Sequence, residues 1–304
     1  MKKYDVIGVG CCAFDCLMKV SKNPGPDERI RAGDFIIQGG GEVGTALVAV
    51  ARLGGKAKFI GRLGNDNFGE FLIEDFKREG VDTSSTILEK RKTTRFACIL
   101  VDEKTGKRGI IYSEKGVPGA MPSDIRESEI KQAKYLLVSQ ASPGIEASLK
   151  AARIMKKAGG TVVLDATKII PQTKEFLRLS DVIIVDEEFA CLLIGEKNYF
   201  RSAQKIFSMK KKGIVVVTAG TKGSFCVSKE GKFHTQAFKV KAVDTTGAGD
   251  VFHGAFALGL LRKWPLPYTA KFASAVSAMK CRSLGGRAGI PKLAEVKKFL
   301  KISH

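Results

Sequence analysis

The segment Asp244-Thr-Thr-Gly-Ala-Gly-Asp250 holds the residues best suited to chemistry in this chain of 304 residues. Gly247, Ala248 and Gly249 are small, so their backbone N–H groups can approach an anion. The apolar run that follows predicts a helix, whose N-terminus adds partial positive charge. Asp250 lies at that terminus, where a carboxylate can take a proton from a hydroxyl aimed at a bound phosphate, which indicates phosphoryl transfer. The alternative is that Asp250 only caps the helix and the glycines form a tight turn.

This segment, followed by an apolar helix, resembles the signature of the ribokinase (PfkB-type) carbohydrate kinase family. A second motif lies at 39–54, where GGGEVGTALVAVARLG is similar to the family's Gly-Gly sugar-binding loop and the helix that follows it. The sequence FIGRLGNDNFG at 59–69 comes next, as it does in the family. Residues 217–223 resemble the family's nucleotide-side loop. The likeness spans nearly the whole chain.

The resemblance implies a role for each matching residue. Asp250 would be the catalytic base, and the amides of residues 247–249 would form an anion hole for the γ-phosphate of ATP. The residues implied to face the sugar are Asp15, Gly40, Gly41 and Thr45. An anionic sugar derivative would need cations near the lid, for which Arg29, Arg31 and Arg95 are available, and Arg95 is the predicted contact. The residues implied to lie along ATP are Thr218, Gly220 and Gly223, and Gly286 and Gly289 in the late loop that borders the adenine.

Two metal ions are also implied. The family's Asn-x-x-Glu motif, linked to Mg²⁺, falls at 186–189, where this chain has Asp-Glu-Glu-Phe. Because Mg²⁺ favours oxygen ligands and retains waters, Asp186 or Glu187 would act on it through water. Asp244 and Thr246 match positions that help to hold a monovalent cation in several members, so K⁺ is a further implied cofactor.

Three positions depart from the family pattern: Ala13 and Thr45 stand where asparagine is common, and Phe189 replaces the final Glu of the Mg²⁺ motif. Within the family, the stretches FKVKAVDTTGAGDVFHGAFA and MKCRSLGGRAGIP are most similar to a subgroup that includes sulfofructose kinases. These stretches lie mainly on the nucleotide and catalytic side, so the sugar and its reacting hydroxyl stay open.

The elements that must position these residues alternate between strand and helix. Strands are expected at 4–9, 58–61, 135–139, 161–165, 181–185 and 214–218, and helices at 43–53, 67–79, 145–158, 172–179, 187–194, 201–212, 251–262, 268–282 and 292–301. Such alternation predicts a three-layer αβα sandwich with a mostly parallel sheet. We expect one domain over residues 1–304, with hairpins at 93–112 and 223–238 and a small β-sheet lid formed by about 14–37 and 91–113.

Composition narrows the partners. The chain has 51 Lys and Arg against 31 Asp and Glu, a formal charge of +20, but the cations are spread along it, so no nucleic-acid partner is expected. The positive field would instead help to attract ATP, which is negatively charged.

The N-terminus reaches Asp5 at once and no run is long and apolar enough for a membrane helix, so a soluble, cytoplasmic protein without a membrane partner is expected. Seven cysteines without a paired CxxC indicate reduced thiols. Family lids often pair between chains, which with the apolar alternation at 93–101 predicts a homodimer.

Two competing interpretations remain. Residues 8–13 (GVGCCA) satisfy the dinucleotide fingerprint of a Rossmann dehydrogenase, but a Lys-Asn-Pro-Gly-Pro segment at 22–26 follows where a helix should begin. We therefore interpret them as a strand end. A non-catalytic sugar- or nucleotide-binding protein on the kinase fold is the other alternative, favoured by Phe189 and opposed by Asp250.

Overall fold

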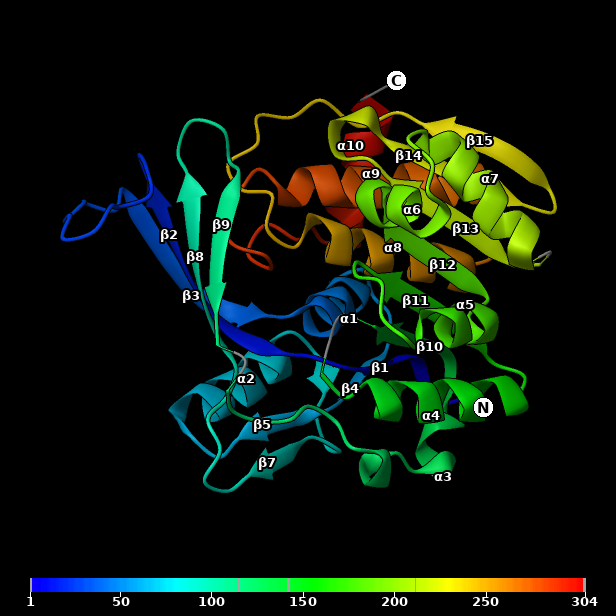
Figure 1. Cartoon of the computed structure of the whole chain (residues 1–304), viewed down its shortest axis with the longest axis horizontal. Coiled ribbons are helices and arrows are strands. Elements are labelled where there is room, and N and C mark those ends of the chain that lie inside the picture. The colour runs from blue at the N-terminus through cyan, green and yellow to red at the C-terminus, as the bar shows by residue number, and fades with distance from the viewer. Residues whose placement is uncertain (1, 114, 141–142, 211, 303–304) are drawn as a thin grey trace.

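A nine-stranded sheet forms the centre of the computed structural model, which describes residues 2–113, 115–140, 143–210 and 212–302 (Figure 1). Neighbouring strands are parallel except at the end where β13, β14 and β15 pair antiparallel. In spatial order the strands are β15 (Gly231–Thr235), β14 (Ser224–Ser228), β13 (Ile214–Thr218), β12 (Val182–Asp186), β11 (Thr161–Ala166), β10 (Ala133–Ser139), β1 (Tyr4–Val9), β4 (Ala57–Ile60) and β6 (Val81–Asp82).

Helices cover both faces of this sheet, as predicted, because successive strand residues contribute to opposite cores. In β1, Val6 belongs to one core and Ile7 to the other. The first core is shared with α1 (Glu42–Arg52), α2 (Asn67–Arg78), α8 (Ala248–Leu261), α9 (Leu266–Lys280) and α10 (Leu293–Ile302). The second is shared with α3 (Glu127–Ile130), α4 (Ile145–Lys157), α5 (Thr173–Leu179), α6 (Glu187–Ile194) and α7 (Tyr199–Lys210), and two 3₁₀ turns lie at Pro122–Asp124 and Gly220–Lys222.

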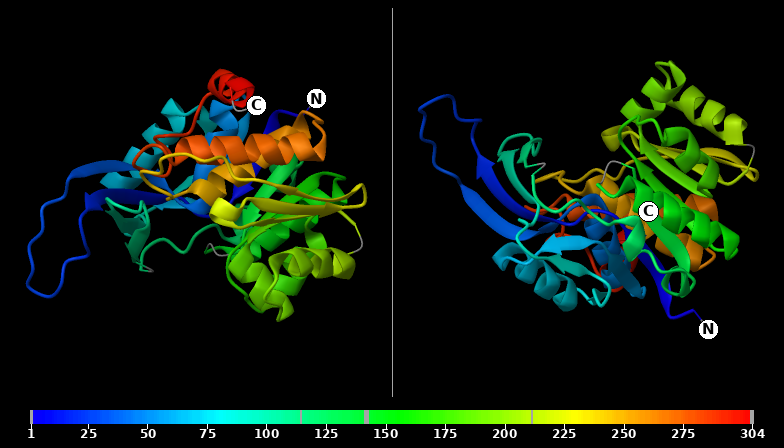
Figure 2. Two further views of the ribbon diagram at one scale, coloured as in Figure 1. Left: turned by 90° about the horizontal axis from the view of Figure 1, so that it is seen from above. Right: turned by 60° about the horizontal axis from the view of Figure 1, so that its bottom comes forward.

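A separate four-stranded sheet forms the lid, with the order β3 (Asp34–Gly40), β2 (Ala13–Val20), β8 (Phe96–Asp102) and β9 (Arg108–Tyr112). The predicted hairpin at 93–112 is β8 and β9, which pair antiparallel. The chain between β2 and β3 projects away from the body of the molecule (Figure 2). A further pair, β5 (Arg62–Gly64) with β7 (Ile87–Glu89), has no counterpart among the predicted elements because each strand is only three residues long.

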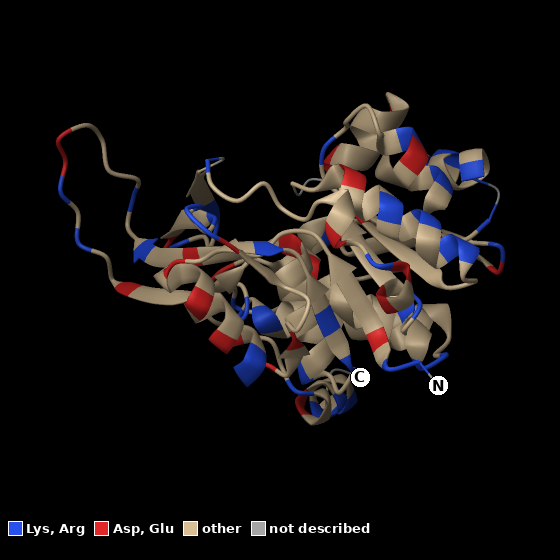
Figure 3. Cartoon of the chain, turned by 90° about the horizontal axis from the view of Figure 1, so that it is seen from below, with Lys and Arg blue, Asp and Glu red and all other residues tan. Residues whose placement is uncertain are grey.

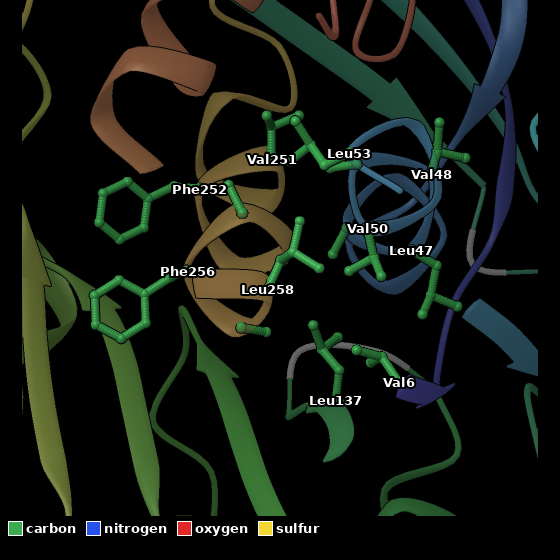
Figure 4. Packing of buried hydrophobic residues seen from close by; sticks show 14 of the residues in the cluster. Val6, Leu47, Val48, Val50, Leu53, Leu137, Val251, Phe252, Phe256 and Leu258 are labelled. Carbon is green, nitrogen blue, oxygen red and sulfur yellow. The ribbon is translucent and has the colours of Figure 1, made fainter. Parts of the chain in front are cut away.

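The region after β1 decides against the dehydrogenase alternative. Residues 8–13 lead from β1 directly into the lid strand β2, so no helix N-terminus follows the fingerprint to hold a pyrophosphate. The side chains of α1 and α8 pack against each other over the sheet (Figure 4), and Gly254 of α8 lies directly on the carbonyl oxygen of Ala46. A side chain at 254 would hold these two helices apart. Close packing therefore sets their N-termini next to each other.

Charged residues of both signs are intermixed along the helices and loops seen from below (Figure 3). Within the part of the chain that the structure describes, no helix has both the length and the hydropathy that crossing a bilayer would require.

Candidate active site

The first turn of α8 holds the central residues of the predicted site. Gly247 adopts a left-handed conformation (φ 73°) and is the residue that precedes the helix, and Ala248 begins it. Asp250 is thus the third residue of α8 and does not cap it, which corrects both the cap alternative and the expected start at 251. The helix begins early because glycine reaches a positive φ without strain and lets the turn close at once.

The segment 244–249, called the phosphate loop below, is open on one side and packed on the other. A Cβ built on Gly249 would meet nothing within 4 Å, whereas one on Gly247 would lie 3.0 Å from the Gly286 carbonyl oxygen and 3.3 Å from the Thr45 methyl group. The predicted phosphate loop therefore contacts both the late loop and the sugar loop. The Ala248 amide donates a long hydrogen bond of 3.3 Å to the Thr245 carbonyl. One of the three amides of the predicted anion hole is therefore already bonded to the protein backbone.

Several carboxylates surround Asp250, which is itself partly exposed. Burial and the negative charges of Asp165, Glu42 and Asp15 raise the pKa of Asp250 well above its usual range, while Arg108 opposes this shift. A carboxylate whose pKa is raised binds a proton more readily, which is the property that a general base needs.

Asp15, a predicted sugar contact, is buried on β2 and packs against the backbone of Gly40. Burial is the largest cause that raises its pKa to about 7, with Glu42 and Asp244 adding to it and Arg287 opposing it. Gly41 precedes α1 with φ 80°, and Thr45 is buried one turn into that helix. These four predicted sugar contacts therefore lie together.

Arg95 stands beside this group. Its positive charge lowers the pKa of Cys11, the residue that follows the turn after β1, although burial leaves that pKa raised overall. The Nε atom of Arg95 is buried, and no described residue accepts a hydrogen bond from it.

Three of the predicted nucleotide residues, Thr218, Gly220 and Gly223, lie at or just beyond the carboxyl end of β13, and the other two, Gly286 and Gly289, follow α9. Thr218 ends β13 and donates to the Val185 carbonyl at 3.3 Å. Gly220 begins a 3₁₀ turn and faces open space, whereas Gly223 lies with φ 92° directly on the Thr235 carbonyl. Gly289 lies against the Lys280 carbonyl, since a Cβ built on it would lie 2.4 Å from that oxygen.

The two residues predicted for Mg²⁺ have roles in the fold. Asp186 caps α6 by accepting from the Phe189 amide at 2.6 Å, and Glu187 pairs with Lys222 at 2.8 Å. Burial and the neighbouring Glu188 and Glu187 raise the pKa of Asp186. Among the described residues, no three His, Cys, Asp or Glu side chains converge as a metal site. The oxygen donors present suit Mg²⁺ only if phosphates and waters complete its shell.

The residues predicted to hold a monovalent cation are already bonded to protein groups. One carboxylate oxygen of Asp244 accepts from the amide and hydroxyl of Thr246 at 2.8 and 2.6 Å, and the other accepts from the Gly285 amide at 2.7 Å. The ammonium of Lys280 donates to the backbone carbonyls of both Asp244 and Thr246.

Four further residues of this region were not predicted. Asp165 is the second-last residue of β11 and lies beside His253, with 3.5 Å between its carboxylate and the imidazole. Burial raises the pKa of Asp165 to about 6. A carboxylate at the carboxyl end of a buried strand is a recognisable signal that could have identified it. Arg287 and Lys280 are buried cations contributed by later parts of the chain, and neither has a local sequence signal.

The lid touches the phosphate loop directly. Arg108 of β9 donates to the Thr245 hydroxyl at 3.2 Å, and that hydroxyl donates to the Gly106 carbonyl in the β8–β9 turn at 3.2 Å. The same arginine acts electrostatically on Asp250. This hairpin was predicted to be part of the lid, and Arg95 within it to face the sugar, but no role was predicted for Arg108.

Known proteins agree with this architecture. A model of the pfkB family of carbohydrate kinases matches residues 3–293. A ribokinase of Haemophilus influenzae is 32% identical over 302 residues, covering 96% of this chain and 97% of its own. A 5-dehydro-2-deoxygluconokinase of Clostridium perfringens is 30% identical over 322 residues, covering 99% and 94%. The structure of an Arabidopsis thaliana ribokinase complexed with ribose and ATP matches with a TM-score of 0.83 and 25% identity, over 98% of this chain and 99% of that one. The chain therefore belongs to the pfkB family of carbohydrate kinases.

Proposed function

We propose that this protein transfers the γ-phosphoryl group of ATP to a hydroxyl of a small sugar or sugar derivative, with Asp250 as the base. The observation that carries the proposal is the first turn of α8, where a partly exposed carboxylate stands beside a glycine that faces open space. The Arabidopsis relative complexed with ribose and ATP supports both ligands. In the proposed reaction, Asp250 removes the hydroxyl proton while the amides of residues 247–249 bind the phosphate.

ATP would lie along Thr218, Gly220 and Gly223, with Gly286 and Gly289 bordering its base. Mg²⁺ would be held through water by Asp186 or Glu187, because the oxygen donors of the described residues do not form a complete metal site without phosphates. When bound, Mg²⁺ would offset negative charge on the phosphates. Closure of the lid, through the contact of Arg108 with Thr245, would exclude water from the site.

The substrate assay is a measurement of ADP release over a panel of pentoses, hexoses, nucleosides and anionic sugars. The relatives act on ribose and on a keto-deoxy sugar acid by their names, and the motifs resemble sulfofructose kinases, so the panel includes each class. Turnover with one of them is expected. Binding of ATP without turnover on any of them would favour the non-catalytic alternative.

Sugar affinity should depend on the protonation of Asp15. Because its pKa is about 7, the carboxylate that accepts from sugar hydroxyls forms only as the pH rises through 7, and KM for the sugar should fall over that range. Asp15→Asn should raise KM and abolish this pH dependence. The stability of the apo protein offers an independent check. Because folding raises the pKa of Asp15, its protonated form stabilises the folded protein. This stabilisation is complete below the usual pKa of 3.8 and is lost as the pH rises toward 7. Asp15→Asn should therefore raise Tm above pH 7, and an unchanged Tm there would contradict the shift.

The two glycines of the phosphate loop provide a matched pair. Gly249→Ala should lower kcat/KM for ATP by about 10–100-fold, because a methyl group would enter the open space where the phosphate approaches. Its Tm should not fall, since alanine favours a helix over glycine. Gly247→Ala should lower Tm, because φ is 73° and the new Cβ would lie 3.0 Å from the Gly286 carbonyl. Full ATP turnover by Gly249→Ala would contradict the proposed phosphate position.

We propose that two copies of this chain form a homodimer in which their lid sheets contact each other. Direct strand partners share a face of a sheet, and the row Ile37, Cys16, Cys98 and Ile111 crosses all four lid strands. Ile111 is 65% exposed, and Phe35, two residues from Ile37 on the same face, is also 65% exposed. An exposed apolar sheet face of this kind favours a partner, and family lids pair with each other.

Sedimentation velocity tests this assembly. Ile111→Asp should convert the dimer to a monomer, because a charge would be buried at the interface. Leu192→Asp on α6 changes a side chain of equal exposure far from the lid and should leave the dimer intact. A wild-type monomer at micromolar concentration, or dissociation by both variants alike, would contradict the lid interface.

A further inference from the structure

The end of α9 places a buried ammonium group beneath the phosphate loop. Lys280 is the last residue of α9 and is fully buried. Its Nζ donates to the backbone carbonyl of Asp244 at 2.9 Å and to that of Thr246. These are the two residues at which the family resemblance implies a monovalent cation.

The oxygen atoms that such a cation would use are already satisfied. Both carboxylate oxygens of Asp244 accept hydrogen bonds from Thr246 and Gly285, as described above. Asp244 is fully buried too, so its negative charge needs a compensating positive charge in the protein interior. Lys280 supplies that charge at the carbonyl of the same residue. A second cation at this position would repel the ammonium.

We propose that Lys280 is a built-in substitute for the monovalent cation, so that this kinase needs no K⁺. An ammonium group resembles K⁺ in size and charge, and it interacts with carbonyl oxygens in the same way. The consequence for activity rests on the function proposed above. Lys280 is a positioning residue: it holds the carbonyls of the segment that leads into Gly247 and does not touch the substrates itself.

Further contacts from α9 show why this position matters for the phosphate loop. Ser277 donates to the Ala248 carbonyl at 2.8 Å, on the first turn of α8. The Cys281 carbonyl accepts from the amides of Val243 and Asp244 at 2.8 and 3.2 Å. The end of α9 thus holds the loop before and after the glycine that precedes α8. Loss of the ammonium would leave two buried carbonyls and a buried carboxylate unbalanced.

The first experiment compares the wild-type enzyme in potassium, sodium and choline chloride at equal ionic strength. We expect the same kcat, the same KM for ATP and the same Tm in all three salts. A severalfold rise of kcat in potassium, or a Tm that rises only with potassium, would overturn the proposal. This arm needs no variant to fold.

The second experiment removes the ammonium with Lys280→Ala. In choline chloride, kcat/KM for ATP should fall by about 10²-fold, because the phosphate loop loses its fixed position. Potassium or ammonium chloride should restore part of that loss and raise the variant's Tm, whereas choline should do neither. Wild-type kinetics of the variant in choline chloride, or equal responses to choline and potassium, would overturn the proposal.

Lys58→Ala is the matched control. Lys58 is also a buried lysine, but it pairs at 2.8 Å with Glu129 of α3, on the sheet face opposite α1 and α8. Its loss should lower Tm without creating a response to potassium. The Tm measurements use the apo protein, so they test the built-in cation even if no sugar is turned over. Absence of turnover in every salt would count against the proposed function alone.

Discussion

Asp250→Ala is expected to lower kcat by about 10²–10⁴-fold, because the sugar hydroxyl loses the group that accepts its proton. KM for ATP and for the sugar should change little, since the proton moves only as the phosphoryl group is transferred. Stopped assays of ADP release, combined with calorimetric titration of ATP and sugar, measure both quantities. A variant with near wild-type kcat would show that another group is the base.

Asp250→Asn separates a loss of chemistry from a loss of structure. The raised pKa of Asp250 means that its ionisation in the folded protein costs stability as the pH rises above the usual range of a carboxylate. The amide carries no charge, so the variant should be inactive and yet have a higher Tm than the wild type at alkaline pH. In the wild type, kcat should rise with pH as Asp250 loses its proton. An inactive Asp250→Asn variant with a lowered Tm would indicate a structural role instead.

Arg287→Ala is expected to lower the free energy of unfolding by about 3–5 kcal/mol, because it breaks a buried ion pair. The guanidinium donates to the carboxylate of Asp75 and to the Gly40 carbonyl, both at 2.8 Å, and lies 4.8 Å from the Phe76 ring. Loss of the bond to Gly40 should also raise KM for the sugar. Urea denaturation and steady-state kinetics measure the two effects.

Arg78→Ala is the control on the same carboxylate. Arg78 pairs with Asp75 at 2.9 Å, but its side chain is 61% exposed. Its loss should cost no more than about 1 kcal/mol, because exposed ion pairs contribute little. Equal destabilisation by the two variants would mean that the burial of Arg287 does not determine its contribution.

The sequence predicts well what depends on local chemistry. The presence of α8 after the glycines follows from small residues before an apolar run, although the helix begins at Ala248 and not at 251 as expected. The helices on both sheet faces follow from the alternation of buried strands with amphipathic segments. The carboxyl ends of parallel strands then place Thr218 and Asp186 at one edge. Each of these features depends only on residues that lie close together in the sequence.

The features that were not predicted depend on distant parts of the chain. β2 pairs in parallel with β8, which lies about eighty residues further on, and the short run of each strand does not specify its partner. Lys280 ends an apolar helix, where a lysine is ordinarily a solvated residue at the helix C-terminus. Only the fold places its ammonium against a loop 36 residues earlier in the sequence. Buried cations of this kind have no periodic signal.

Asp15 shows how a local sequence motif and contacts between distant parts of the chain together determine the properties of one residue. Its prediction as a sugar contact comes from the motif, but its pKa of about 7 comes from burial and from the negative charges of Glu42 and Asp244, opposed by Arg287, in three distant parts of the chain. The sequence therefore indicates which residue contacts the sugar, and the structure determines the pH range in which that residue is charged.

The most direct test of the central claim is ³¹P NMR of the wild-type enzyme with ATP, Mg²⁺ and the sugar that gives the fastest ADP release. We predict a new phosphomonoester resonance that grows in equal amount with ADP, and no such resonance with Asp250→Ala. Formation of ADP with inorganic phosphate alone, or the same phosphomonoester from Asp250→Ala at a similar rate, would contradict it.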